Sequence, residues 1–267
     1  MNGFVRRESG LDVGRYMRLV MRETDDLQLV GLAEAAPHLL RPEGGFRTGA
    51  ILTMIDSVGG LGGGLAALPD GWVVSTNLTA RVVATVHDGP LRIDSGLLRR
   101  GRNSVVMRVR IHDEGGDGAL VASGVLTSAI LVPENGPPRW ERPLTLGTHE
   151  PARDMPAIPD WLGVRPAGAG AVEIDLADEL RTPWGILHGG VGAMLDDVAA
   201  EQAAGGACTT SVVLHFLAPN RVGPVRATAR VLGRRADGHV VRIEVRDEGA
   251  ARTTAIAIAT VTADGAA

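Results

Sequence analysis

Apolar and polar residues alternate along several stretches of this chain, most clearly over 104–113 and 239–247. Such alternation is typical of antiparallel strands with one buried face. Two other stretches, 51–58 and 191–198, instead carry apolar residues at spacings of three and four, which predicts helices. The pattern predicts an α+β fold with one long helix and several strands in each half. The predicted strands cover 29–36, 73–86, 90–100, 104–113 and 119–132, then 171–177, 210–217, 224–232, 239–247 and 252–262.

The two halves of the sequence are related to each other. Residues 75–115 align without a gap on 209–249, and 12 of these 41 positions are identical. Residues 31–57 align on 172–198 with six identities in 27 positions, among them Asp56 and Asp197. A repeat of this length predicts two similar domains that pair as a pseudo-dimer, as the subunits of twofold homodimers do.

A proline-rich segment separates the two copies. Residues 133–160 contain seven prolines, which remove amide donors and disfavour both helix and central strand. We therefore predict an N-terminal domain over 1–132, a linker over 133–160 and a C-terminal domain over 161–267.

Composition narrows the functional class. The 267 residues include 27 Arg and no Lys, 31 acidic residues and 3% aromatic residues, for a net charge of −4. Neither the charge nor the aromatic content fits a nucleic-acid-binding protein. A single cysteine, Cys208, together with the lack of an apolar run long enough for a signal peptide or membrane span, favours a cytoplasmic protein without membrane contact.

The most informative stretch runs from Thr182 to Val198. His188, Gly189 and Gly190 precede the predicted helix, where unpaired amides can stabilise an oxyanion. Asp197 follows Gly189 by eight residues and His188 by nine, and nine helical residues span about 13 Å. The glycines and the aspartate of one helix therefore cannot act on the same carbonyl. A working site has to combine the helix start of one copy with the aspartate of the other.

The run HGGVGAMLDD, with an aspartate nine residues after the histidine and a later strand ending in FLAP, resembles PaaI-type acyl-CoA thioesterases of the hotdog fold. The resemblance is stronger in the second half and implies two tandem hotdog domains. It also implies hydrolysis of an acyl-CoA thioester with no cofactor and no metal. Hotdog proteins often assemble further, so the resemblance leaves a homodimer of pseudo-dimers open.

The resemblance implies specific roles for residues of two composite sites. In the first, Gly189 is the oxyanion donor, His188 the helix-start histidine, Asp56 the nucleophile or base, and Ser75 the strand hydroxyl beside it. The reciprocal site joins Arg47 and Thr48 to Asp197 and Thr209, but Arg and Thr replace the expected His and Gly there. Arg47 is expected to bind an anionic group or to solvate a helix end. Further substrate contacts are expected from Gly190, Thr182 and Thr210.

Other readings of the same residues stay open. The first copy lacks the His and the first Gly of the motif, which is compatible with a non-catalytic protein that binds an acyl group or another small molecule. A hotdog dehydratase or hydratase that acts on acyl thioesters is a further alternative to the thioesterase. Asp196 is expected to be a solvated helix acid. The glycine-rich stretch after Asp56, which no clear helix follows, is expected to be a flexible rim near the acyl tunnel. Six further histidines are expected on the surface or on strands, without metal-ligand spacing: His38, His87, His112, His149, His215 and His239.

Overall fold

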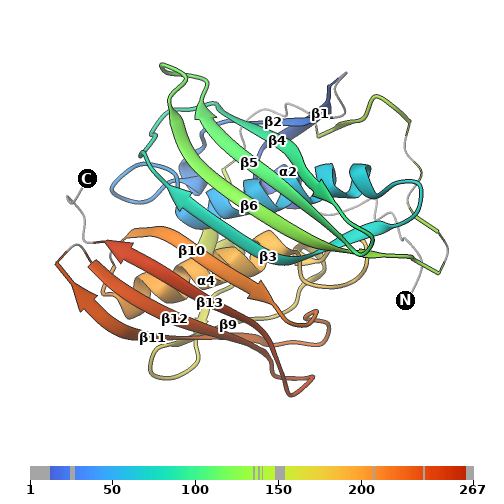
Figure 1. The fold of residues 1–267 in the computed structure, drawn as a ribbon. Helices are drawn as coiled ribbons and strands as arrows, with labels where there is room; N and C mark the ends of the chain where they lie inside the picture. The colour runs from blue at the N-terminus through green and yellow to red at the C-terminus, as the bar shows by residue number, and fades with distance from the viewer. Residues whose placement is uncertain are drawn as a thin grey trace.

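The protein consists of two copies of one long helix wrapped by an antiparallel sheet, as the sequence predicts (Figure 1). The computed structural model describes residues 13–24, 28–134, 136–137, 139, 141–147, 154–206, 208–236 and 238–262. The first copy contains β1 (Leu19–Glu23), β2 (Leu29–Ala33), α2 (Thr48–Ala67), β3 (Trp72–Val82), β4 (Leu91–Arg100), β5 (Ser104–Asp113) and β6 (Leu120–Leu131). The second contains β9 (Ala171–Ile174), α4 (Gly189–Ala203), β10 (Cys208–Phe216), β11 (Val225–Arg235), β12 (Gly238–Asp247) and β13 (Arg252–Thr262).

The strands lie where alternation of apolar and polar residues predicted them, and the helices differ more. The glycine-rich stretch that follows Asp56 was expected to be a flexible rim, and this prediction is wrong. Residues up to Ala67 continue α2, which has 20 residues against 15 in α4. Gly59, Gly62 and Gly64 lie against side chains of the sheet, so their small size allows α2 to approach it closely.

The two sheets join edge to edge into one continuous sheet. Its strand order is β7-β1-β2-β4-β5-β6-β3-β10-β13-β12-β11-β9-β8, where β7 (Thr145–Leu146) and β8 (Arg165–Pro166) are short edge strands. Strands β3 and β10 pair antiparallel, with Thr79 opposite Val213. These two residues are equivalent in the repeat, so a pseudo-twofold axis passes between them. The continuous sheet therefore fixes how the two copies are oriented.

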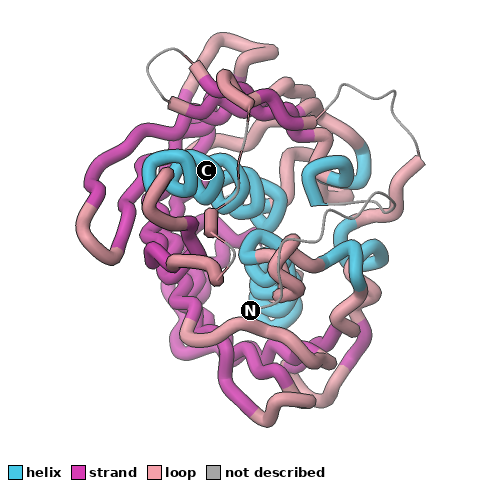
Figure 2. Tube along the Cα trace, turned by 90° about the vertical axis from the view of Figure 1, so that its right-hand side faces the viewer, coloured by secondary structure: helices cyan, strands magenta, loops and turns pink. Residues whose placement is uncertain are grey.

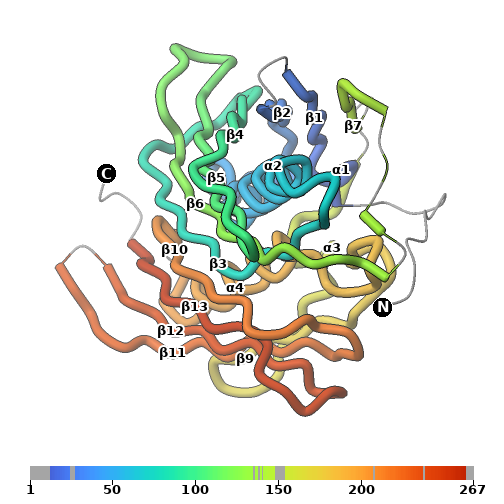
Figure 3. The backbone as a smooth tube through the Cα atoms, turned by 45° about the vertical axis from the view of Figure 1, so that its right-hand side comes forward, coloured from blue at the N-terminus to red at the C-terminus, as the bar shows by residue number. Residues whose placement is uncertain are grey.

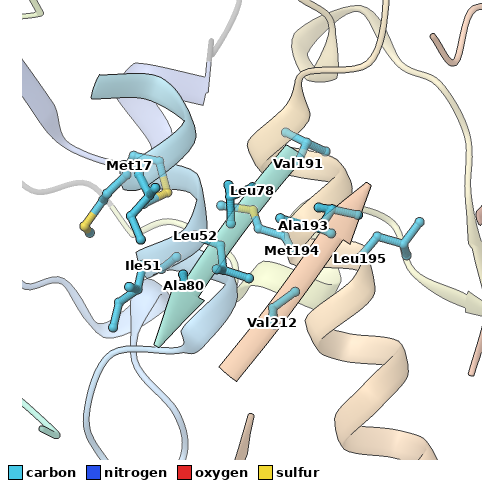
Figure 4. Packing of buried hydrophobic residues seen from close by; sticks show 14 of the residues in the cluster. Met17, Ile51, Leu52, Leu78, Ala80, Val191, Ala193, Met194, Leu195 and Val212 are labelled. Atoms are coloured by element: carbon cyan, nitrogen blue, oxygen red, sulfur yellow. The ribbon is translucent and has the colours of Figure 1, made fainter. Parts of the chain in front are cut away.

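The two long helices lie next to each other inside the curved sheet (Figures 2 and 3). Leu78, Ala80 and Val212 from β3 and β10 pack with Met194 of α4 and with residues of α2 in one shared hydrophobic core (Figure 4). Helix α2 is long and apolar enough to span a membrane by composition, but 83% of that window is buried inside the protein. Here it is the core helix of the first copy.

Part of the predicted linker is attached to the first copy. Strand β7 pairs with β1, and the buried carboxylate of Glu23 accepts hydrogen bonds from Arg142 and from the Leu144 amide. The ring of Tyr16 stacks on Trp161, in the short helix α3 (Ile158–Trp161), with 3.8 Å between centroids. Residues 135, 138, 140 and 148–153 of the linker lie outside the described part of the chain, as does His149.

The helices are antiparallel and touch at glycines. A Cβ added to Gly190 would lie 2.8 Å from Thr53 Cα, and one added to Gly49 would lie 3.0 Å from Met194 Cα. The hydroxyl of Thr53 also donates to the carbonyl oxygens of Gly49 and Gly190, at 2.8 and 2.9 Å. Close contact of the two backbones therefore sets the distance between α2 and α4.

We predict that Gly190→Ala separates the helices, because the added methyl group would lie 2.7–2.9 Å from three atoms of Thr53, one of them the backbone Cα. The free energy of unfolding should fall by about 2–3 kcal/mol, and Tm in a thermal melt by roughly 5–10 °C. Gly192→Ala in the same helix is the matched control, since its Cβ would meet only Leu187, at 3.8 Å. That variant should be unchanged or slightly more stable. Equal melting temperatures for the two variants would contradict the close-packing explanation.

Candidate active site

The first composite centre joins Asp56 of α2 to the start of α4. The Asp56 carboxylate accepts a hydrogen bond from the Gly190 amide at Oδ2 and one from the Ser75 hydroxyl at Oδ1, at 2.8 and 2.7 Å. Nδ1 of His188 lies 3.5 Å from Oδ2 and accepts from the same Gly190 amide at 3.0 Å. The structure therefore brings Asp56, Ser75, His188 and Gly190 together from both copies of the repeat.

The Gly189 amide is the free donor of this centre. Within the described part of the chain, this amide makes no hydrogen bond. A Cβ on Gly189 would lie 2.8 Å from Asp56 Oδ2, so Gly189 and the carboxylate are immediate neighbours. The first amides of α4 carry the positive end of the helix dipole. An unpaired amide beside a carboxylate is the arrangement that polarises a carbonyl for attack.

The second composite centre has the reciprocal arrangement with different surroundings. The Asp197 carboxylate accepts from the Gly49 amide at 2.8 Å, as Asp56 accepts from Gly190. Thr48 stands at the position equivalent to Gly189, and its hydroxyl donates to the carbonyl oxygen of Thr209. Asp197 is 1% exposed, Thr48 2% and Thr209 0%. The expectation that Thr48 and Thr209 contact a substrate does not agree with this burial, because both face protein atoms.

An ion pair closes the second centre. Arg47 donates to Glu201, one helical turn after Asp197, and Nε of Arg41 lies 3.8 Å from the same carboxylate. We expected Arg47 to bind an anionic group or to solvate a helix end. The structure instead pairs its charge with Glu201. In the first centre the residue one turn after Asp56 is Gly60, and His188 takes the place of Arg47. The first centre therefore lacks the ion pair that stands beside Asp197 in the second.

Asp196 is buried rather than solvated, which corrects the expectation from the sequence. It is 2% exposed, and neither carboxylate oxygen has a hydrogen-bond partner among the described residues. Burial, with a smaller contribution from the charge of Asp197, raises the pKa of Asp196 to about 8. Burial and then Asp197 also raise the pKa of Glu201 to about 8, against the opposing effect of Arg47 and Arg41. Burial likewise raises the pKa of Asp197, although Arg47 lowers it.

The remaining predicted residues hold the backbone around the two centres. Register shifts after Ser75 in β3 and after Thr209 in β10 mark equivalent β-bulges. The extra residue is Thr76 in one and Thr210 in the other, and each hydroxyl donates to a carbonyl of the neighbouring strand. Thr182 accepts from the Trp184 amide at 3.3 Å in the turn before α4. Thr182 and Thr210 thus make hydrogen bonds to backbone close to the centres.

Among the described residues, the histidines other than His188 make no hydrogen bond with a residue of either centre. His38 is buried and not on the surface, with Nε2 2.8 Å from the carbonyl oxygen of Tyr16, and burial lowers its pKa. Across the described ranges, no three His, Cys, Asp or Glu side chains are grouped so that they could hold a metal ion.

Sequence reasoning missed Gly60, Arg41 as a partner of Glu201, and Glu201 itself. The signal for Glu201 was its position four residues after Asp197, on the same helical face. The signal for Gly60 was its alignment with Glu201 in the repeat. Neither residue type suggested chemistry without the geometry, since a helical glutamate is usually solvated and a glycine has no side chain.

Comparison with known proteins supports this architecture. Residues 48–119 match the family model described as the thioesterase superfamily. The match lies in the first copy, whereas the motif resemblance is stronger in the second. A search of curated proteins finds no match.

Three solved structures align with both copies. The 12:0-ACP thioesterase of Umbellularia californica is 11% identical, with a TM-score of 0.61 over 89% of this chain and 97% of its own. An acyl-ACP thioesterase of Bacteroides thetaiotaomicron is 10% identical, with a TM-score of 0.60 over 89% and 98%. A conserved protein of unknown function with a hot dog fold from Alicyclobacillus acidocaldarius is 15% identical, with a TM-score of 0.59 over 90% and 94%. The chain has a tandem hotdog fold. At 10–15% identity, the similarity to these three structures shows that the chain shares their fold. It does not show that the chain shares their substrates.

The buried Asp196 gives a testable pH dependence. Its pKa is about 8 in the folded double hotdog and near 3.8 in an unfolded chain, so the folded state holds a proton that the unfolded state releases. Stability from this group is complete below pH 4 and is lost as the pH rises toward 8. The Tm advantage of Asp196→Asn over the unmodified protein should therefore grow by roughly 5–10 °C between pH 5 and pH 8. A pH-independent difference in melting scans would show that Asp196 is not held neutral.

Proposed function

We propose that this protein hydrolyses acyl-CoA thioesters at the first composite centre, as a PaaI-type thioesterase. The observation that carries the proposal is the position of the Asp56 carboxylate beside the unpaired Gly189 amide, which comes from the other copy. A nucleophile or base and an oxyanion donor are the two elements that acyl transfer needs. The match of residues 48–119 to the thioesterase superfamily supports thioester hydrolysis as the reaction class.

In the proposed reaction the thioester carbonyl oxygen accepts a hydrogen bond from the Gly189 amide. Negative charge that develops on this oxygen is stabilised by the amide and by the N-terminal end of α4. Asp56 either attacks the carbonyl carbon or removes a proton from an attacking water, and the thiolate of CoA leaves. The Gly190 amide and the Ser75 hydroxyl hold the Asp56 carboxylate in place for either route. The chemistry uses only side chains and backbone amides.

We further propose that only the first centre is active. A substrate carbonyl at the second centre would need the space that the Thr48 side chain occupies and the region that the pair of Arg47 and Glu201 closes. The same proposal includes CoA as the thiol carrier, a cytoplasmic location and pairing of two chains. It also keeps the domain boundaries 1–132, 133–160 and 161–267.

The first test compares the two acidic residues. Asp56→Asn should lower kcat by about 100-fold or more, because it removes the general base or nucleophile. Asp197→Asn keeps an acceptor for the Gly49 amide and should leave kcat within about threefold, because the second centre is closed. Thiol release from a panel of acyl-CoA esters, followed with a thiol reagent, measures both. Equal losses would mean that both centres work, and full activity of the double variant would disprove the assignment.

The second test uses the helix-start glycine. Gly189→Ala places a methyl group 2.8 and 2.9 Å from the two Asp56 carboxylate oxygens. This is closer than van der Waals contact, so the methyl group has to displace the carboxylate. We expect a loss of kcat of about 100-fold, with KM changed far less. Gly192→Ala in the same helix should retain full activity. If ligands raise Tm but neither the unmodified protein nor Gly192→Ala releases thiol, the protein is an acyl binder and not a hydrolase.

A further inference from the structure

Ser128 lies next to the first centre on the inner face of the sheet. It is directly opposite Ser75 in the β3–β6 pair, and opposite residues of an antiparallel pair project to the same face. The Ser75 hydroxyl reaches Asp56 on α2, so this face is the one that contacts the helix. On the other side Ser128 pairs with Val105 of β5, which is fully buried. Ser128 is thus a polar side chain between the catalytic strand and the apolar core.

The Ser128 hydroxyl has no use in the fold. The residue is 0% exposed, and Oγ finds no hydrogen-bond partner among the described residues. Leaving a buried hydroxyl unpaired costs about 1–3 kcal/mol, and buried polar groups are normally paired with protein atoms or with ordered water. A fully buried serine elsewhere in the same sheet, Ser95, shows the usual outcome, since its hydroxyl donates to the Leu29 carbonyl at 3.1 Å.

Helix α2 has two glycines close to Ser128 at which an added methyl group would make only ordinary contacts. A Cβ added to Gly60 would touch only Leu126, two residues before Ser128, and at 3.9 Å. A Cβ added to Gly63 would find Val105 and Val73, at 3.7 and 3.8 Å, with Met107 at 3.5 Å. These are the strand residues that flank Ser128 and Ser75. Gly60 and Gly63 therefore face this part of the sheet, in the two helical turns that follow Asp56. In the second copy Glu201 stands at the position equivalent to Gly60.

We propose that Ser128 and Ser75 together hold the water molecule that attacks the thioester, with Ser128 as a positioning residue. The Ser75 hydroxyl donates its proton to Asp56 and keeps its lone pairs free to accept from this water. Ser128 supplies a second contact, and the two hydroxyls keep the water close to Asp56. Buried waters usually have two to four such partners. The inference rests on the proposed hydrolase function and assigns Asp56 the role of general base.

The reaction then balances as follows. The water oxygen forms a bond to the carbonyl carbon while one of its protons passes to the Asp56 carboxylate. The tetrahedral intermediate collapses, the carbon–sulfur bond breaks, and the thiolate takes the proton from Asp56. A carboxylic acid and a thiol leave, and the carboxylate is restored. No oxidant, reductant or covalent enzyme intermediate is needed.

The test is Ser128→Ala, assayed for thiol release and for thermal stability. Because the hydroxyl makes no hydrogen bond within the protein, Tm should be unchanged or higher. Loss of one contact to the water should lower kcat by about 10-fold, with KM within twofold. Ser95→Ala is the matched control and should lower Tm while kcat stays unchanged. Ser128→Cys, which keeps the size but is a poor hydrogen-bonding group, should repeat the loss of kcat if Ser128→Ala does not fold.

The outcomes separate this inference from the proposed function. If Asp56→Asn abolishes thiol release but Ser128→Ala and Ser128→Cys keep full kcat, the hydrolase assignment stands and the role of Ser128 is disproved. A fall in Tm with an equal loss of kcat in Ser128→Ala and Ser95→Ala would give Ser128 a structural role and also overturn the inference. If Asp56→Asn keeps full activity, the proposed function itself fails.

Discussion

The close antiparallel contact of α2 with α4 is the constraint on which the rest of the structure depends. Each helix begins with unpaired amides and carries an aspartate about two turns later, at a distance too long for one helix to use both. Contact through Gly49 and Gly190 lets the aspartate of each helix reach the first amides of the other. The same amides would otherwise be buried without acceptors, so the contact satisfies backbone groups and builds a reactive centre at once.

The continuous sheet makes this contact reproducible. Pairing of β3 with β10 orients the two copies about the axis at Thr79 and Val213, and each helix packs inside its own curved half. Equivalent β-bulges then direct Ser75 toward Asp56 and place Thr209 next to Asp197. The pseudo-symmetry therefore extends from the sheet to the side chains of both centres. A few substitutions between the copies, among them Gly60 against Glu201 and His188 against Arg47, give the two centres different surroundings.

Those substitutions also show how much the sequence could predict. The strands followed from alternation, and the pairing of Asp56 with the start of α4 followed from the repeat and the length of a helix. The closed state of the second centre did not, because it depends on Glu201 meeting Arg47 from the other helix. Asp196 was assigned to solvent from residue type alone, whereas packing of α4 buries it. Periodicity finds which residues share a face, but not which faces are covered once two copies associate.

The asymmetry between the centres has a physical rationale in the energetics of buried charge. In the second centre Asp197 and Glu201 share the charges of Arg47 and Arg41. The neighbouring Asp196 has no hydrogen-bond partner among the described residues, so not all three carboxyl groups can be ionised with compensation. A neutral substrate carbonyl would gain little there, since the amide and the cations already serve the protein's own acids. In the first centre the polar partners of Asp56 among the described residues are the Gly190 amide, Ser75 and His188, and the Gly189 amide makes no hydrogen bond there. The duplicated chain thus has one centre in which crowded carboxyl groups compete for the amide and the cations, and one in which a single carboxylate lies beside an amide that makes no hydrogen bond among the described residues.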